Sequence, residues 1–351
     1  MRSPIVEDDL RRTLQLVGPL WDELRGARIF VTGGTGFFGT ALLESFAAAN
    51  ETLRLGASAV VLSRNPAAFQ AEHPHLSPDF GIRFLAGDVK TFDFPDEPFT
   101  HVIHAAATSA SETFRNADIL SKFDTVLGGT QRVLDFASVC GAKKMLYTSS
   151  GVVYGVQPPE LTHVCEEYTG APATMDTATL AAWGSSKRAA EFLCACYARK
   201  QGFEVKIARC FSFAGPGLPL DIHYAIGNFI RDGFKGGPIR ILGDGTPRRS
   251  YLYISDLIVW LWTILLRGAS MKPYNVGSEQ DVSIAELAHL VAESFPGMVE
   301  VQIAKPAVPG TAPDRYVPST ARARTELGLA ETVDLREAIR RTIAHMSFKP
   351  E

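Results

Sequence analysis

Thr32-Gly33-Gly34-Thr35-Gly36-Phe37-Phe38-Gly39 is the stretch of sequence that decides the fold. It follows the apolar run Arg28–Thr32, which predicts a strand, and precedes Thr40–Ala49, which predicts a helix. Glycines at this spacing allow a tight turn, let the backbone approach a pyrophosphate, and leave free amides at the positive end of a helix. Because strand, spacing and helix agree, the stretch predicts a dinucleotide-binding turn.

Short apolar runs alternate with longer helical segments after this turn. The expected strands are 59–62, 83–86, 101–104, 144–148 and 205–209, and the expected helices are Thr125–Cys140 and Ala182–Lys200. Such alternation indicates parallel strands joined by right-handed helical crossovers. We therefore expect an α/β fold with a doubly wound parallel (Rossmann) sheet and a smaller C-terminal substrate-binding lobe.

The chain divides into three parts. Residues 1–26 predict an N-terminal helical extension, because leucines recur in it near helical spacing, and residues 27–210 predict the dinucleotide-binding Rossmann domain. Residues 211–351 form mostly the smaller lobe, although the strand and helix around 251–277 are expected to return to the Rossmann domain. Within the lobe, Ser283-Ile284-Ala285-Glu286 has the pattern of a capping box that opens a helix.

Composition excludes several classes of protein. The 351 residues carry a net charge of −3, which offers no basic field to nucleic acid or to an anionic membrane. No run reaches the roughly 18 uncharged apolar residues that a membrane span needs, and the N-terminus lacks an apolar signal-peptide region. Five cysteines are an odd number without disulfide spacing, which favours a cytoplasmic location. Cys194 and Cys196 make a poor metal pair, and we expect no metal site.

Further positions extend the expected dinucleotide site. Asp88, just past an expected strand, can accept from an adenine amino group or cap a turn, and His104-Ala105-Ala106-Ala107 ends a strand with small residues that suit a passing ribose and phosphate. The second strand ends in Ser63 and Arg64, where an acid would grip the ribose 2′-hydroxyl of NAD. Arg64 favours the 2′-phosphate of NADP, but Ser63 can equally bond a 2′-hydroxyl while Arg64 stacks on adenine.

Motifs along residues 28–346 resemble those of the extended short-chain dehydrogenase/reductase group, the NAD(P)-dependent nucleotide-sugar epimerases and dehydratases. They are Thr32–Gly39, Gly87–Asp88, His104–Ala107, Thr148–Gly155, Gly184–Lys187 and Gly243–Arg249. The resemblance implies NAD or NADP as cofactor and a nucleotide-diphosphate sugar as the ligand of the lobe. The implied cofactor contacts are Gly33, Thr35, Gly36, Phe37, Phe38, Gly39, Ser63, Arg64, Asp88, Val89, Ala105, Ala106, Ala107, Lys187 and Cys210.

Members of this group usually work through a Ser or Thr, a Tyr and a Lys. The resemblance places the hydroxyl at Ser150 and the lysine at Lys187, which would hold the nicotinamide ribose and lower the pKa of the tyrosine. The tyrosine belongs four residues before the lysine, but that position is Trp183, whose indole cannot act as a general base. Three explanations stay open. Tyr154 or Ser150 takes the proton, or oxidation is lost and the protein only binds its ligands, or a slow or partial reaction persists.

The resemblance also implies a set of substrate contacts. Arg249 would clamp the diphosphate and Arg315 would add a second clamp. Ser150 is followed by Gly151 and Val152, where dehydratases and decarboxylases of the group carry acids, so elimination (as in a 4,6-dehydratase) and decarboxylation are disfavoured. We therefore expect a nucleotide-sugar epimerase or oxidoreductase, or else a catalytically impaired relative. The full set of implied contacts is Ser149, Ser150, Phe211, Ser212, Asn228, Arg249 and Arg315.

Two long expected helices, Phe123–Cys140 and Ala182–Lys200, resemble the pair that makes a four-helix dimer interface in this group. The resemblance therefore implies a homodimer. The sequence alone names neither the nucleobase nor the sugar of the substrate.

Overall fold

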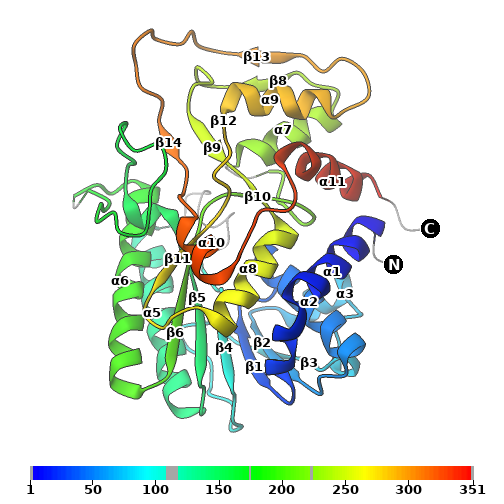
Figure 1. Ribbon diagram of the computed structural model, residues 1–351, viewed down its shortest axis with the longest axis vertical. Coiled ribbons are helices and arrows are strands. Elements are labelled where there is room, and N and C mark those ends of the chain that lie inside the picture. The colour runs from blue at the N-terminus through cyan, green and yellow to red at the C-terminus, as the bar shows by residue number, and fades with distance from the viewer. Residues whose placement is uncertain (1–2, 108–117, 174, 222–223, 349–351) are drawn as a thin grey trace.

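The structure is a computed structural model that describes residues 3–107, 118–173, 175–221 and 224–348 (Figure 1). At its centre, seven strands form one sheet in the order β11-β6-β5-β4-β1-β2-β3, and every neighbouring pair is parallel. This confirms the expected doubly wound parallel sheet. The strands are β1 (Arg28–Thr32), β2 (Ser58–Ser63), β3 (Ile82–Ala86), β4 (His101–His104), β5 (Lys144–Ser150), β6 (Glu204–Cys210) and β11 (Pro273–Val276).

Two hydrophobic layers cover the two faces of this sheet. Ile29 and Val31 of β1 belong to the layer that contains α2 and α8, whereas Phe30 between them belongs to the layer that contains α5 and α6. This follows from the alternation of side chains along a strand, and it leaves β1 buried on both faces. The helices of the Rossmann part are α2 (Phe37–Leu53), α3 (Pro66–Glu72), α5 (Ile119–Val139), α6 (Thr179–Gln201) and α8 (Ile254–Arg267), with the 3-10 turns η2 (Pro78–Phe80) and η3 (Gly151–Tyr154).

The smaller lobe lies at the carboxyl end of the sheet, at the top of Figure 1. Its strand β9 pairs antiparallel with β12 and parallel with β14, and β8 pairs with β13. Helix α9 begins with the expected capping box, since Ser283 and Glu286 each accept from the other's backbone amide. The elements of residues 211–351 outside the central sheet and α8 are β7 (Phe213–Ala214), α7 (Ala225–Phe234), β8 (Ile239–Ile241), β9 (Arg248–Ser250), β10 (Leu252–Tyr253), β12 (Asp281–Ser283), α9 (Ile284–Glu293), β13 (Val301–Ile303), β14 (Arg315–Tyr316), α10 (Ala321–Leu327) and α11 (Leu335–Ser347).

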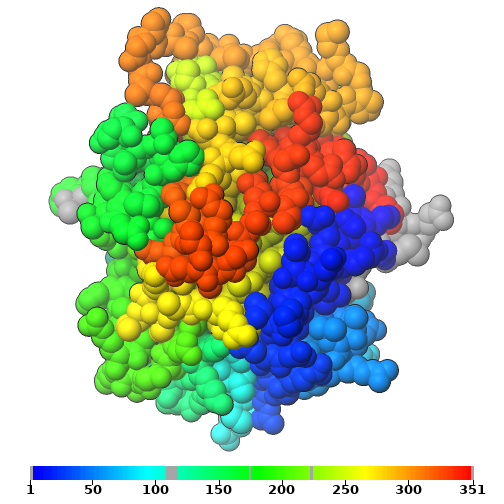
Figure 2. Space-filling model, in the orientation of Figure 1, coloured from blue at the N-terminus to red at the C-terminus, as the bar shows by residue number. Residues whose placement is uncertain are grey.

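The N-terminal extension is helical and packs on the main body. It comprises α1 (Pro4–Val17) and the 3-10 turn η1 (Gly18–Leu24), and α1 contacts α2, α8 and α11. Ser3, which caps α1, lies 2.8 Å from Nδ1 of His345 in α11. Asp9 of α1 is buried beside Tyr253 and Arg341, and this burial raises the pKa of Asp9 to about 6. The first and last helices therefore meet on the surface, as the blue and red segments of Figure 2 show. None of the described helices is long and apolar enough to cross a bilayer.

Glu331 is a half-buried acid between the lobe and α8, and it makes stability depend on pH. Ser278 donates to its carboxylate at 2.8 Å, but burial and the nearby carboxylates of Asp256, Asp334 and Glu279 raise its pKa from 4.5 to about 7. Between pH 4.5 and about 7, the folded protein keeps a proton on Glu331 that the unfolded chain has lost. The free energy of unfolding therefore falls as the pH rises through this range. We expect the free energy of unfolding of Glu331→Gln to exceed that of wild type by about 1–2 kcal/mol at pH 8, and to show no such increase at pH 4.5. Urea unfolding at both pH values measures this, and an equal difference at the two would contradict it.

Candidate functional site

The glycine turn is built by backbone contacts that exclude side chains. Gly33 has a φ of +74°, and a Cβ there would lie 2.5 Å from the Ala105 carbonyl carbon. A Cβ on Gly39 would lie 2.1 Å from the Gly33 carbonyl oxygen, so α2 can pack directly on the turn. Gly36 is the N-cap of α2 and supplies no side-chain cap. The first amides of α2 are therefore suited to bind an anion, which fits the pyrophosphate of a dinucleotide.

A cavity of about 1690 Å³ opens at this turn. It brings together cofactor contacts expected from four separate segments, and Trp183 of α6 lines the same cavity. Lys187 and Cys210, the other two expected cofactor residues, are buried and are not part of its wall. The expected residues in the wall are Gly33, Thr35, Gly36, Phe37, Phe38, Gly39, Ser63, Arg64, Asp88, Val89, Ala105, Ala106 and Ala107.

Ser63 and Arg64, the residues expected to distinguish NAD from NADP, are arranged in a way that is compatible with either cofactor. Ser63 is largely buried and its hydroxyl accepts from the Asn65 amide at 3.3 Å, while Arg64 is exposed at the cavity wall. Asp88 caps a turn, because its carboxylate accepts from the Lys90 amide at 2.9 Å, and the residue also lines the cavity.

Lys187 is fixed at the carboxyl end of β5. Its Nζ donates to the Thr148 carbonyl at 2.8 Å and lies 4.7 Å from the centre of the Tyr147 ring. Only 3% of the residue is exposed, and burial lowers the pKa of Lys187 to about 8. The lysine therefore lies beside the strand that ends in Ser150.

Trp183 lies one helical turn before Lys187, at the position where the family resemblance implies a tyrosine. Its indole Nε1 is buried and has no hydrogen-bond partner within the described residues. An unpaired buried N–H costs about 1–3 kcal/mol, so a ligand acceptor that reached this group would be stabilised by it. An indole N–H donates but does not accept a proton.

The structure argues against Tyr154 as a substitute base. Its hydroxyl donates to Asn275 Oδ1 at 2.8 Å and accepts from Arg209 Nη1 at 2.8 Å. Arg209 in turn pairs with both carboxylate oxygens of Glu191. Burial raises the pKa of Tyr154 well above its ordinary value. The hydroxyl therefore belongs to a buried structural network that uses it both as a donor and as an acceptor.

Tyr154→Phe tests this assignment. Removing the hydroxyl leaves Arg209 and Asn275 each without one buried partner, so we expect the free energy of unfolding to fall by about 1–3 kcal/mol. NAD affinity should stay within about twofold of wild type. Tyr168→Phe, on the neighbouring ring, is the matched control. A variant with normal stability that loses only turnover would instead identify Tyr154 as the base.

Tyr316 is a residue that the sequence did not single out. Its hydroxyl lies 3.4 Å from Ser150 Oγ, and its ring packs on Phe211 with centroids 4.7 Å apart. Burial raises the pKa of Tyr316, which keeps the hydroxyl protonated and able to donate. The two hydroxyls come from positions 166 residues apart, so no spacing in the chain signals the pair. The one clue is that Tyr316 directly follows Arg315.

The two expected diphosphate clamps lie on neighbouring strands. Arg249 belongs to β9 and Arg315 to the adjacent β14. Each guanidinium is ion-paired, Arg249 with Asp314 at 2.7 Å and Arg315 with Asp281 at 2.6 Å. A diphosphate that binds here must compete with these carboxylates.

Other expected substrate contacts are engaged inside the protein. Ser149 is buried and donates to Glu191 at 2.6 Å, which does not fit a substrate-binding role. Asn228 accepts from Arg231 at 3.0 Å within α7. Ser212 lies directly before β7, and its backbone carbonyl accepts from the Leu252 amide of β10 at 3.0 Å, which leaves the role of its side chain open.

Comparison with known proteins identifies the family of this chain. The family model described as the NAD dependent epimerase/dehydratase family matches residues 29–277. UDP-glucuronic acid decarboxylase 6 of Arabidopsis thaliana is 30% identical over 315 residues, which cover 89% of this chain and 86% of the relative. UDP-glucuronic acid decarboxylase 1 of Xenopus tropicalis is 27% identical over 90% of this chain and 71% of its own length.

Solved structures show the same fold. A UDP-glucuronic acid 4-epimerase of Bacillus cereus, in complex with UDP-glucuronic acid and NAD, superimposes with a TM-score of 0.75 at 23% identity, covering 91% of this chain and 98% of the other. An epimerase of Methanothermobacter thermautotrophicus gives a TM-score of 0.77 at 22% identity, covering 95% and 96%. The chain belongs to the NAD dependent epimerase/dehydratase family, which confirms the group that its motifs indicated.

Proposed function

We propose that the protein binds NAD or NADP and a nucleotide-diphosphate sugar, and that it transfers hydride at a sugar carbon as an epimerase or oxidoreductase. One observation carries this proposal: a single cavity runs from the uncapped N-terminus of α2 to Trp183, one turn from Lys187. A dinucleotide with its pyrophosphate on the turn would direct its nicotinamide toward Trp183. The bound nicotinamide would supply the hydride acceptor.

UDP-glucuronic acid is the first substrate to test. It is named both in the decarboxylases that resemble this chain and in the complex of the Bacillus cereus epimerase. Gly151 and Val152 follow Ser150 and place no acid there, so we favour epimerisation over decarboxylation.

The proton of the reacting sugar hydroxyl needs an acceptor in place of the missing tyrosine. Tyr154 and Tyr316 both have raised pKa values, and Tyr154 is held in its network. Lys187 differs from both, because burial brings its pKa down to about 8 and a fraction of its amine is neutral near physiological pH. We therefore propose that Lys187, which lies behind the cavity wall, takes up the proton by relay and not by direct contact, while the Ser150 and Tyr316 hydroxyls orient the sugar.

A second candidate function is a catalytically impaired binding protein. Trp183 favours it, since the indole fills the position of the family's general base while the dinucleotide turn is intact. Both functions need the same cofactor site, and they differ in whether hydride leaves the sugar.

Single-turnover hydride transfer separates the two functions. Purified protein is mixed with NAD+ or NADP+ and with UDP-glucuronic acid, UDP-glucose or dTDP-glucose, and the absorbance of reduced nicotinamide is followed. Formation of reduced cofactor, or of a sugar epimer detected by chromatography, establishes the enzyme. Binding of cofactor and nucleotide sugar without either product establishes the binding protein. The same measurement with NAD+ and with NADP+ shows which of the two cofactors Ser63 and Arg64 favour.

We further propose a homodimer formed by α5 and α6. The two helices lie side by side, and Phe192 of α6 is 69% exposed although it is a large apolar residue. We expect light scattering at micromolar concentration to give twice the chain mass of 38.1 kDa for wild type, and Phe192→Asp to give the chain mass. Met298→Asp, on the fully exposed Met298 of the lobe, is the control that should stay dimeric. A wild-type monomer would exclude the dimer.

A further inference from the structure

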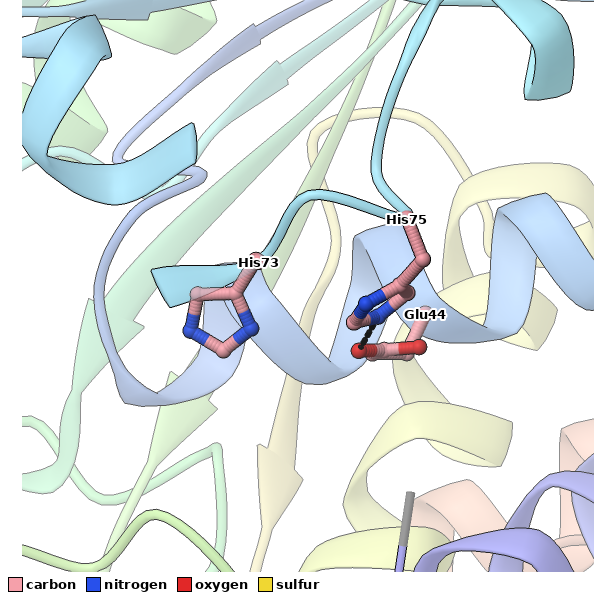
Figure 3. A group of neighbouring side chains, drawn as sticks. All are labelled: Glu44, His73 and His75. Carbon is pink, nitrogen blue, oxygen red and sulfur yellow. Dashed lines mark hydrogen bonds and ion pairs between the residues drawn. The ribbon is translucent and has the colours of Figure 1, made fainter. Parts of the chain in front are cut away.

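Two histidines and a glutamate meet in the wall of the cavity that opens at the glycine turn. Glu44 is a largely buried residue in the middle of α2, and His73 and His75 flank Pro74 in the loop that follows α3. All three line the same cavity as Ser63 and Arg64. Figure 3 shows the His75 ring directed at the Glu44 carboxylate, with the His73 ring beside them.

Distances within this cluster are those of a ligand set. His75 Nε2 lies 2.5 Å from Glu44 Oε1, and the ligand atoms of all three residues lie within 4.8 Å of one another. A tetrahedral zinc ion with bonds of about 2.0–2.1 Å to nitrogen places its ligand atoms roughly 3.3 Å apart. Binding would therefore part Glu44 from His75 slightly and draw His73 inward. Side-chain movements of about 1.5 Å are enough, and His73 and His75 sit in a loop that is only half-buried.

The local fold holds the two rings on one side of the chain. His73 closes α3, its amide donating to the Phe69 carbonyl at 2.9 Å, and the Leu76 amide donates to the His73 carbonyl at 3.0 Å. Its ring stacks on Phe69 with centroids 4.4 Å apart. The turn from 73 to 76 thus sets both imidazoles over α2, where Glu44 supplies the only negative charge of the three.

We propose that Glu44, His73 and His75 form a binding site for one divalent transition-metal ion, with zinc as the best match. Two imidazoles and one carboxylate are a recurring zinc ligand set that leaves a fourth position open, and here the open position faces the cavity. This site departs from the expectation of no metal that the cysteine pattern gave. It does not depend on hydride transfer, because the proposed transfer of hydride and proton uses none of these three residues.

Cobalt and zinc titrations of the full-length protein, first dialysed against a chelator, test the site. We expect one equivalent of Co2+ to produce the visible absorption of a four-coordinate ion, and Zn2+ to displace it. Zn2+ should also raise the melting temperature, because it binds only the folded chain at this site. Thiolate binding at the exposed Cys165 or Cys196 would give a separate charge-transfer band in the near ultraviolet, which identifies it.

Matched variants decide the location. His73→Ala and His75→Ala change half-buried loop residues, and each should weaken Co2+ binding at least about 100-fold and abolish the rise in melting temperature. Glu44→Gln keeps the size of the buried side chain and should weaken binding similarly. His289→Ala, on an exposed face of α9, should bind Co2+ as wild type does. Absence of saturable binding in wild type, or binding unchanged in both histidine variants, overturns the proposal and leaves Glu44 and His75 as a simple ion pair.

Discussion

Gly36→Val should abolish tight cofactor binding without unfolding the protein. Gly36 has an extended backbone, and a Cβ there would meet only the Gly33 carbonyl oxygen at 3.5 Å, an ordinary contact. A valine side chain would nevertheless occupy the cavity wall in front of the first amides of α2, where the pyrophosphate must approach the backbone. We expect the dissociation constant for NAD to rise at least about 100-fold, equivalent to about 2.7 kcal/mol. Calorimetry with NAD+ and NADP+ measures this.

Two further glycine variants are controls for this experiment. Gly243→Val adds the same side chain in open space and should bind cofactor as wild type does. Gly39→Ala should instead destabilise the fold, because its Cβ would collide with backbone atoms of Gly33 and Gly34 that cannot rotate away. If Gly36→Val melts at the wild-type temperature and still binds NAD tightly, the pyrophosphate does not bind at this turn.

Trp183→Tyr should increase the rate of hydride transfer more than any other single change. The tyrosine hydroxyl would enter the end of the cavity one turn from Lys187, whose positive charge favours the tyrosinate. A positioned general base contributes about 100- to 10,000-fold in rate, so we expect at least a 100-fold faster formation of reduced cofactor. Single-turnover absorbance with UDP-glucuronic acid and the preferred cofactor is the measurement.

Trp183→Phe is the matched control, since it removes the indole without adding an ionisable group. A rate for Trp183→Tyr no higher than that of Trp183→Phe would show that the hydroxyl is not the missing element. Loss of nucleotide-sugar affinity in both variants would instead assign the buried indole N–H to substrate binding, since it has no partner within the described residues.

Local features were predictable from sequence because each is encoded within a few neighbouring residues. The glycine turn, the strand before it and the helix after it follow from spacing alone, and the structure keeps all three. The capping box at Ser283 and Glu286 is local in the same way. Trp183 could be identified as a departure because the family resemblance implies a tyrosine four residues before Lys187.

What the sequence by itself determined is therefore the parallel sheet and the glycine turn, and its resemblance to a family pointed to the tyrosine that Trp183 replaces. Only the tertiary structure showed that the Tyr154 hydroxyl is hydrogen-bonded to Asn275 and Arg209. It also showed that the Tyr316 hydroxyl of the smaller lobe lies beside Ser150. It alone also gathered Glu44 with two histidines from a separate loop. The physical reason is that these contacts join side chains far apart in sequence. Their partners are set by how helices and loops pack on the sheet, and packing leaves no periodic signal in the chain.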